Sequence, residues 1–169
     1  SKHIEHHSFY VYLKDAGIRN ISVFSSFPSH SYIALKTLVD LGFTTKEPIQ
    51  LEGASIRPLD FTAEILRRIA VPDGYTEKEN LWLKVFGKKG KEEKMVGMDC
   101  NVGTQEGWED ATCNIDTGFP AAITAEMIKN GTVAEPGIFS PEFIMPHEPF
   151  FAELGRRKLW IYENGKRIN

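Results

Sequence analysis

The spacing of hydrophobic residues along the chain predicts a helix most clearly over about residues 119 to 130. Ala121, Ala125 and Ile128 recur at helical spacing, and Ala122 and Ile123 widen the same apolar face. The small side chains on this face indicate close packing against another backbone surface. The residues at either end of this segment predict where the helix begins and where it ends.

The start is predicted at Thr117 or Gly118, either of which suits an N-cap, with Pro120 in the first turn, where a missing N–H costs nothing. Asn130 and Gly131 supply the left-handed stop.

Three further helices follow from the same kind of signal. One begins after the break at 27–31, with Ser31 as its N-cap, and runs to about Leu41, with Gly42 as its stop. A second is opened by Pro58 and ends before the turn at 71–74. A third, shorter helix is expected from about Pro149 to Arg157.

Runs rich in β-branched and aromatic residues predict strands, and turn residues divide them. Strands are expected at 9–13, 21–24, 48–51, 54–56, 81–86, 94–102 and 159–162. The pair 81–86 and 94–102 reads as a β-hairpin whose turn is 87–90, and residues 163–166 form another turn signal, after which the chain ends before a partner strand is complete. The prediction is an α+β fold, a mixed and largely antiparallel sheet with helices packed on it, forming one domain over 1–169.

Composition and charge exclude several classes of protein. The chain has 169 residues, 41% of them hydrophobic and 25% charged, with a net charge of −3 and a pI of about 6.0. This balance gives no electrostatic footprint for nucleic acid or for an anionic membrane. No apolar run approaches the roughly 20 residues that span a bilayer. We therefore expect a cytoplasmic protein, with Cys100 and Cys113 as reduced, buried thiols.

Histidines and carboxylates are the candidate chemical groups. His3, His6 and His7 lie together near the N-terminus, but no Cys or carboxylate completes a cage there, so we expect no metal site. His30 follows Pro28 and Ser29 at a helix start, where amide donors favour an anion and an imidazole could donate to a carboxylate or move a proton. A capping or surface role for His30 is the alternative.

Three carboxylates, Glu109, Asp110 and Asp116, precede the helix at 119–130. Paired carboxylates could carry out acid–base chemistry or bind an amine. For Glu109 and Asp110 a solvated acidic loop is the better interpretation. Asp116 stands directly before the turn at 117–120 and is the stronger candidate.

Several catalytic motifs are absent from the sequence. There is no Gly-x-Ser-x-Gly, no His-Glu-x-x-His and no phosphate-binding loop at the lysine-rich turn. There is also no Gly-x-Gly-x-x-Gly, so this chain does not carry the dinucleotide fingerprint itself.

Three blocks of sequence resemble the C-terminal part of the saccharopine dehydrogenase-like family, which includes saccharopine reductases, lysine dehydrogenases and carboxynorspermidine dehydrogenases. They are 117–122 with the helix to Gly131, 137–142, and 150–157. Residues 27–30 look like the family's Arg-Tyr-Pro-Gly-His loop. Ser26 stands where many members have Arg and Ser29 where they have Gly, so a bidentate carboxylate clamp is missing.

The resemblance implies a substrate-binding and dimerisation domain excised from an NAD- or NADP-dependent oxidoreductase that acts on an amino-acid C–N bond, as in lysine or polyamine metabolism. It implies a Rossmann domain in the same polypeptide, a homodimer and an amino-acid-like small molecule as ligand. No cofactor is expected on this chain, which would be inactive by itself. The resemblance makes His30 and Asp116 polar substrate contacts. Thr117, Gly118, Phe119 and Pro120 would form a wall near the cofactor.

The alternative is a non-catalytic dimerisation or small-molecule-binding module with the same fold. The departures at Ser26 and Ser29 favour this alternative slightly.

Overall fold

The fold is α+β, as the sequence predicts, and both of its sheets are antiparallel. The computed structural model describes residues 5–26 and 28–169, so His3 and Phe27 lie outside the described residues. The chain divides into two compact units, the first including Ser22–Tyr75 and the second Ile4–Ile21 with Thr76–Asn169. We describe each unit by itself; the expected single domain stays a prediction. No helix in the described part of the chain is long and apolar enough to cross a bilayer.

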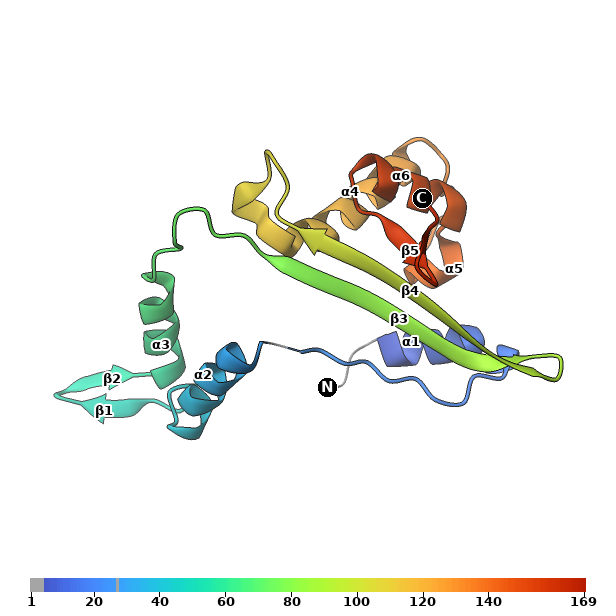
Figure 1. The fold of residues 1–169 in the computed structure, drawn as a ribbon. Helices are drawn as coiled ribbons and strands as arrows, with labels where there is room; N and C mark the ends of the chain where they lie inside the picture. The colour runs from blue at the N-terminus through green and yellow to red at the C-terminus, as the bar shows by residue number, and fades with distance from the viewer. Residues whose placement is uncertain (1–4, 27) are drawn as a thin grey trace. The chain divides into compact units, whose positions relative to one another are not determined.

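The first unit confirms the local signals of the sequence. It contains α2 (Ser29–Asp40), the hairpin of β1 (Ile49–Leu51) and β2 (Ala54–Ile56), and α3 (Pro58–Arg67) (Figure 1). Helix α2 begins at Ser29, two residues before the predicted N-cap, and Gly42 follows it with φ 83°. The Thr62 hydroxyl donates to the Phe43 carbonyl at 2.9 Å and fixes α3 to the end of α2. Thr62 is the only buried residue among those described in this unit.

A long antiparallel hairpin is the frame of the second unit. Strands β3 (Lys78–Lys89) and β4 (Glu92–Gly103) pair along their whole length (Figure 1). Their turn is at Gly90 and Lys91, not at 87–90 as predicted, because Gly90 takes the positive φ of 68° that a two-residue turn needs. Gly87 lies within β3 instead.

Two short strands complete the four-stranded sheet in the order β3-β4-β5-β6. Strand β5 (Ile161–Glu163) pairs with β4, and β6 (Lys166–Arg167) pairs with β5 across the predicted turn. The Asn169 side chain accepts from the Ile161 N–H at 2.8 Å and donates to the Leu159 and Phe151 carbonyls. These bonds fix the end of the chain to the strand and helix beside it.

Two predicted strands are wrong. Residues 9–13 belong to helix α1 (Glu5–Leu13), followed by a single 3₁₀ turn, η1 (Lys14–Ala16). The aromatic side chains that suggested a strand pack against another helix. The Tyr12 ring contacts Phe143 of α5 (Pro141–Ile144) edge-on, with ring centroids 4.8 Å apart. Residues 21–24 form no strand in the described structure.

Helix α4 (Ile115–Lys129) confirms the body and the end of the main predicted helix, but it begins four residues earlier than expected. The 3₁₀ segment η2 (Glu109–Asn114) leads into it directly, with Asn114 already in a right-handed helical conformation. Thr117 and Gly118 are therefore inside the helix, not N-caps, and Pro120 lies in its interior.

The core of the second unit lies on one face of α4. Every fourth residue, Ile115, Phe119, Ile123 and Met127, is buried, and this row packs with residues of β4 and of α6 (His147–Arg156). Of the predicted apolar face only Ile123 is buried, whereas Ala121, Ala122, Ala125 and Ile128 are exposed. Helix α4 is apolar on both faces, and the face with the larger side chains packs into the core.

Candidate functional site

The first turn of α4 carries the acidic residue that the sequence singled out. Asp116 is half-buried there, and the Thr117 hydroxyl donates to its Oδ1 at 3.0 Å. Thr117 itself is exposed. The site therefore begins with a carboxylate whose position is fixed by the helix and by a hydroxyl beside it.

Strand β3 places a second carboxyl group against Asp116. Glu79 stands opposite Val102 in the β3–β4 register, on the side of the sheet that carries the core. Desolvation raises the pKa of Glu79, and the charge of Asp116 and a hydrogen bond with its side chain raise it further. Two carboxyl groups share a hydrogen bond only when one of them holds a proton. Glu79 therefore binds its proton more tightly than an isolated carboxyl group does.

Glu77 extends the acidic group. It accepts a hydrogen bond from the Cys113 N–H at 3.4 Å. Burial raises the pKa of Cys113, and the charges of Glu77, Glu79 and Asp116 raise it as well. We call Glu77, Glu79 and Asp116 the acidic cluster.

Aromatic rings lie on the same side of α4. Trp108 packs edge-on against Phe119, with ring centroids 5.1 Å apart, and Phe119 follows Asp116 by three residues in the helix. Phe119 is buried in the core, whereas Trp108 keeps about half of its surface exposed. A partly exposed indole ring can attract an organic cation.

The backbone that leads into the cluster is strained. Thr112 has φ 50° and ψ −124°, which is unfavourable for a β-branched residue. It stands between the Trp108 turn and Cys113, whose N–H bonds to Glu77. Such strain persists where the surrounding contacts hold the backbone in place, and it is frequent at functional sites.

The other predicted site residues lie on two different helices. Gly118 is exposed and Pro120 half-buried on α4, next to the acidic cluster. His30 is an exposed residue in the first turn of α2, in the other compact unit. The packing within either unit does not bring His30 to Asp116. The roles proposed for these residues stay predictions.

Sequence reasoning missed Glu79 and Trp108. A signal for Glu79 was present, because alternation along β3 puts Glu79 on the same face as Leu81 and Leu83. A carboxylate on a core-facing row needs an explanation. Trp108 had no comparable signal, since it lies in an irregular turn before η2.

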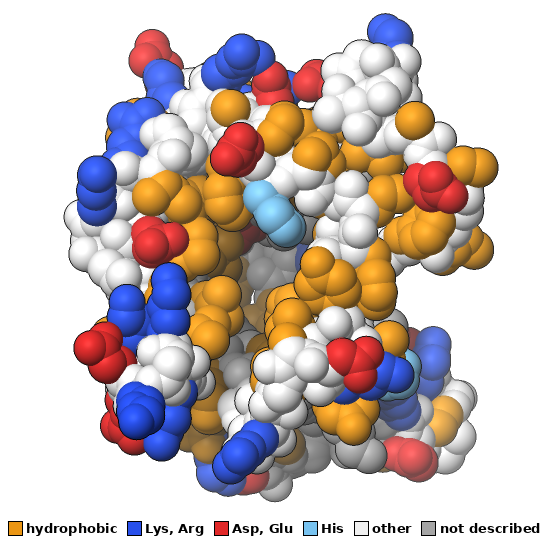
Figure 2. All heavy atoms as spheres, turned by 90° about the vertical axis from the view of Figure 1, so that its right-hand side faces the viewer, with side chains coloured by type: hydrophobic (Ala, Val, Ile, Leu, Met, Phe, Trp, Pro, Cys, Tyr) orange, Lys and Arg blue, Asp and Glu red, His pale blue; other side chains and the backbone are white. Residues whose placement is uncertain are grey.

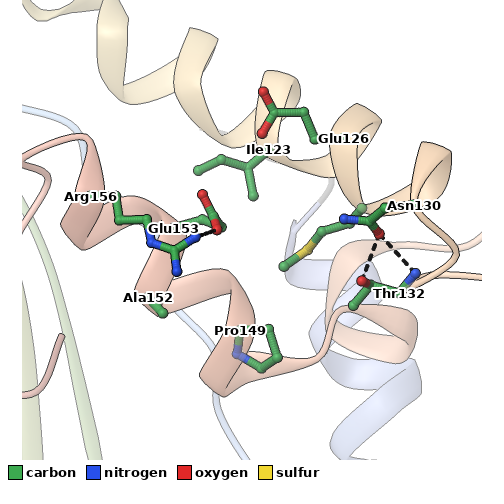
Figure 3. A pocket seen from close by; sticks show the side chains of 9 residues that line it. Ile123, Glu126, Asn130, Thr132, Pro149, Ala152, Glu153 and Arg156 are labelled. Atoms are coloured by element: carbon green, nitrogen blue, oxygen red, sulfur yellow. Dashed lines mark hydrogen bonds and ion pairs between the residues drawn. The ribbon is translucent and has the colours of Figure 1, made fainter.

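A separate small pocket lies between the other end of α4 and α6 (Figure 3). Its volume is about 200 Å³, and Arg156, Glu153, Glu126 and Asn130 are among the side chains that surround it. Beside it, Arg157 forms ion pairs with Glu126 at 2.6 Å and Glu153 at 2.7 Å, which join the two helices. These charges satisfy one another, so we assign them to structure.

No group of three or more metal-binding side chains is positioned to hold an ion within the described residues.

Comparison with known proteins decides the family. A model described as the saccharopine dehydrogenase C-terminal domain matches residues 3–159. The chain belongs to this family. The family assignment agrees with the α+β fold and with the resemblance of the helix α4 block.

The saccharopine dehydrogenase C-terminal domain described here is also similar to a curated protein, carboxyaminopropylagmatine dehydrogenase of Synechocystis sp.. The two are 28% identical over an alignment of 146 residues, and the match covers 80% of this chain. The chain spans 35% of that relative's length.

Proposed function

We propose that this chain is the substrate-binding and dimerisation domain of a saccharopine dehydrogenase-like, NAD(P)-dependent oxidoreductase that acts on an amino-acid C–N bond. Lysine or polyamine-type metabolism in the cytoplasm is the setting that fits this chemistry. Two free cysteines agree with a reducing compartment. The relative's name denotes an agmatine compound, which supports a cationic substrate.

The observation that carries the proposal is the closeness of the Glu79 and Asp116 side chains, which raises the pKa of Glu79. Two carboxylates accept hydrogen bonds from an ammonium or guanidinium group, and the charge-assisted bonds are stronger than neutral ones. Trp108, about half exposed and packed on Phe119 one turn from Asp116, would add a cation–π surface. The acidic cluster would thus hold the cationic end of an amino-acid-like substrate and orient it.

The proton on this pair gives the site a second property. When a cation binds, its charge favours the ionised form of Glu79, so the proton that the raised pKa of Glu79 retains is released. Binding is then linked to pH, and affinity rises as pH increases through the raised pKa of Glu79. Glu79 and Asp116 are also placed to accept a proton from an amine.

The proposal places the nicotinamide dinucleotide outside this chain. The antiparallel pairing of both described sheets and the lack of a Gly-x-Gly-x-x-Gly sequence support this part of the proposal. The cofactor would be held by another domain of the same polypeptide. No step of hydride transfer is assigned to the residues described here.

Ligand binding tests the proposal. L-Lysine and L-arginine should raise the melting temperature of the chain, whereas L-norleucine, which has the same chain length as lysine but no side-chain charge, should not. Asp116→Asn and Glu79→Gln should abolish the difference, and Glu142→Gln on α5 serves as the matched control. Equal effects of lysine and norleucine, or unchanged binding by both site variants, would reject a cation site here.

A non-catalytic module is the second candidate, and the replacement of the family's Arg by Ser26 favours it. A domain of that kind would self-associate without responding to either cationic amino acid. Melting curves and molar mass measured on the same sample therefore separate the two functions.

A further inference from the structure

Two Asn-Gly pairs lie at exposed positions of the second unit. Asn130 and Gly131 follow the end of α4, and Asn164 and Gly165 form the turn between β5 and β6. Both glycines have a positive φ, 78° and 80°. Asparagine is a thermolabile residue, and a following glycine leaves the next backbone nitrogen sterically free to approach the asparagine side chain.

The backbone nitrogen of Gly165 is available for such an approach. Its turn holds two residues, and φ is positive at both Asn164 and Gly165, as a type I′ hairpin requires. The strands pair on either side of the turn, through Glu163 and Lys166. Among the described residues, none accepts a hydrogen bond from the Gly165 N–H. A Cβ at Gly165 would meet no atom within 4 Å, so the space around the turn is open.

The backbone nitrogen of Gly131 is engaged instead. Its N–H donates to the Ile128 carbonyl at 3.2 Å, and the Asn130 N–H donates to the Glu126 carbonyl at 2.9 Å. These hydrogen bonds close the carboxyl end of α4. An attack by the Gly131 nitrogen would first have to open the end of this helix.

The side-chain amides of the two asparagines are held alike. Asn164 Oδ1 accepts from the Gly97 N–H at 2.9 Å, and Asn130 Oδ1 accepts from the Thr132 N–H at 3.0 Å and from its hydroxyl at 2.6 Å (Figure 3). Donors at such distances stabilise negative charge that develops on an amide oxygen. Acidic and basic side chains are interspersed over the face that Figure 2 draws, and a mixture of this kind favours neither pair. The backbone nitrogen is therefore what distinguishes the two pairs.

We propose that Asn164 is a site of spontaneous deamidation and that the fold protects Asn130 from the same reaction. The Gly165 nitrogen bonds to Cγ of Asn164, and the Cγ–Nδ2 bond breaks. The proton of the Gly165 N–H leaves with the side-chain nitrogen as ammonia. Water then opens the cyclic imide at either of its carbonyl carbons, which gives aspartate or isoaspartate. Nothing is oxidised or reduced in these steps.

Isoaspartate at this position would alter the edge of the sheet, because it inserts a methylene group into the backbone of a tight turn. The Asn164 N–H donates to the Gly97 carbonyl at 2.8 Å, and the Ile168 N–H donates to the Ile161 carbonyl at 3.0 Å. Both hydrogen bonds depend on the register that the turn sets. The modified turn should therefore loosen the pairing of β5 and β6.

Peptide mapping by mass spectrometry, after incubation in a mildly alkaline buffer, tests the proposal. In the folded protein Asn164 should convert roughly tenfold faster than Asn130, because Gly131 has to give up a backbone hydrogen bond before it reacts. In concentrated urea the two pairs should convert at similar rates. Conversion of Asn130 as fast as Asn164 in the folded protein would overturn the proposal. So would an unmodified Asn164 in folded protein when the unfolded chain reacts.

Asn164→Gln is the matched variant, because glutamine keeps the amide but has to close a larger ring. It should show no conversion at position 164, and its Asn130 should react as in the wild type. Amide hydrogen exchange at Ile168 should become faster in the incubated wild type, whereas in the incubated variant it should equal that of the fresh variant. An unchanged exchange rate in wild-type protein that carries isoaspartate would overturn the effect on the sheet.

Discussion

Glu79 on β3 lies close enough to Asp116, in the first turn of α4, for the charge and side chain of Asp116 to raise the pKa of the Glu79 carboxyl group. Desolvation and the neighbouring charge make the ionised form of Glu79 costly. The interaction between the long hairpin and the central helix at this point therefore depends on pH.

Glu79 should make the protein less stable as pH rises. Its pKa is raised above the ordinary value of 4.5 in the folded state, so the folded protein binds the proton more tightly than the unfolded one. The free energy of unfolding therefore decreases as pH rises from the unfolded pKa through the folded pKa. Glu79→Gln should remove this slope and stabilise the protein at neutral pH, by less than about 1 kcal/mol because the residue is largely exposed.

Urea denaturation below and above that pH range measures the effect, with Glu142→Gln as the control. The prediction is contradicted if the stability of the wild type rises through this pH range and the Glu79→Gln variant lacks that rise.

The two faces of α4 should respond very differently to truncation. Ile123 is 0% exposed and Ile128 is 58% exposed, although both are isoleucines on the same helix. Ile123→Ala should cost about 2–5 kcal/mol, because it leaves a cavity in the core. Ile128→Ala should change the free energy of unfolding by roughly 0.5 kcal/mol or less. Equal costs, measured by chemical denaturation, would mean that the opposite face is covered in solution.

Arg157 should stabilise the contact between α4 and α6, and this stabilisation should decrease at low pH. Its hydrogen bond to Glu153 is the main cause of the lowered pKa of that carboxyl group. The stabilisation is therefore complete above the unfolded pKa and is lost as pH falls through the folded pKa. Arg157→Met should cost about 1 kcal/mol at neutral pH and less in acid.

Arg156→Met is the matched comparison, because Arg156 also pairs with Glu153 but is 74% exposed. It should have a smaller effect in the same pH series of denaturation curves. The account of the ion pairs is wrong if Arg156→Met costs as much as Arg157→Met.

Both cysteines should be unreactive in the folded protein. Burial raises the pKa of the Cys100 thiol, and the charges of Asp116 and Asp99 raise it further; burial is also the main cause for Cys113. The thiol form therefore persists at neutral pH and is shielded. Alkylation with iodoacetamide, followed by mass spectrometry, should modify neither residue until denaturant is added. Rapid modification of Cys113 in the native protein would mean that the η2 segment opens.

Local sequence signals predicted the elements whose ends are marked by a glycine or a proline. Gly42 and Pro58 fix the helices of the first unit, because a positive φ and a missing N–H have few alternatives. The strand predicted at 9–13 failed for the opposite reason. Its aromatic residues suit a sheet or a packed helix equally, and contact between Tyr12 and Phe143 decides the matter.

The candidate site was predicted in part for a related reason. Asp116 follows from its place beside a helix start, but its partner Glu79 is 37 residues earlier in the chain, and only the β3–β4 register brings the two together. The buried face of α4 could not be chosen from periodicity, since both faces are apolar. His30 was grouped with Asp116 by the family resemblance alone.

Backbone amide NMR during titration with L-arginine tests the central claim most directly, because it locates the ligand. The claim predicts concentration-dependent shifts at Asp116, Thr117 and Gly118 and at Glu79 on β3. It predicts no comparable shifts at Asn130 and Thr132, which line the separate pocket between α4 and α6. Shifts confined to Asn130 and Thr132, or equal shifts with L-norleucine, would contradict a cation site at the acidic cluster.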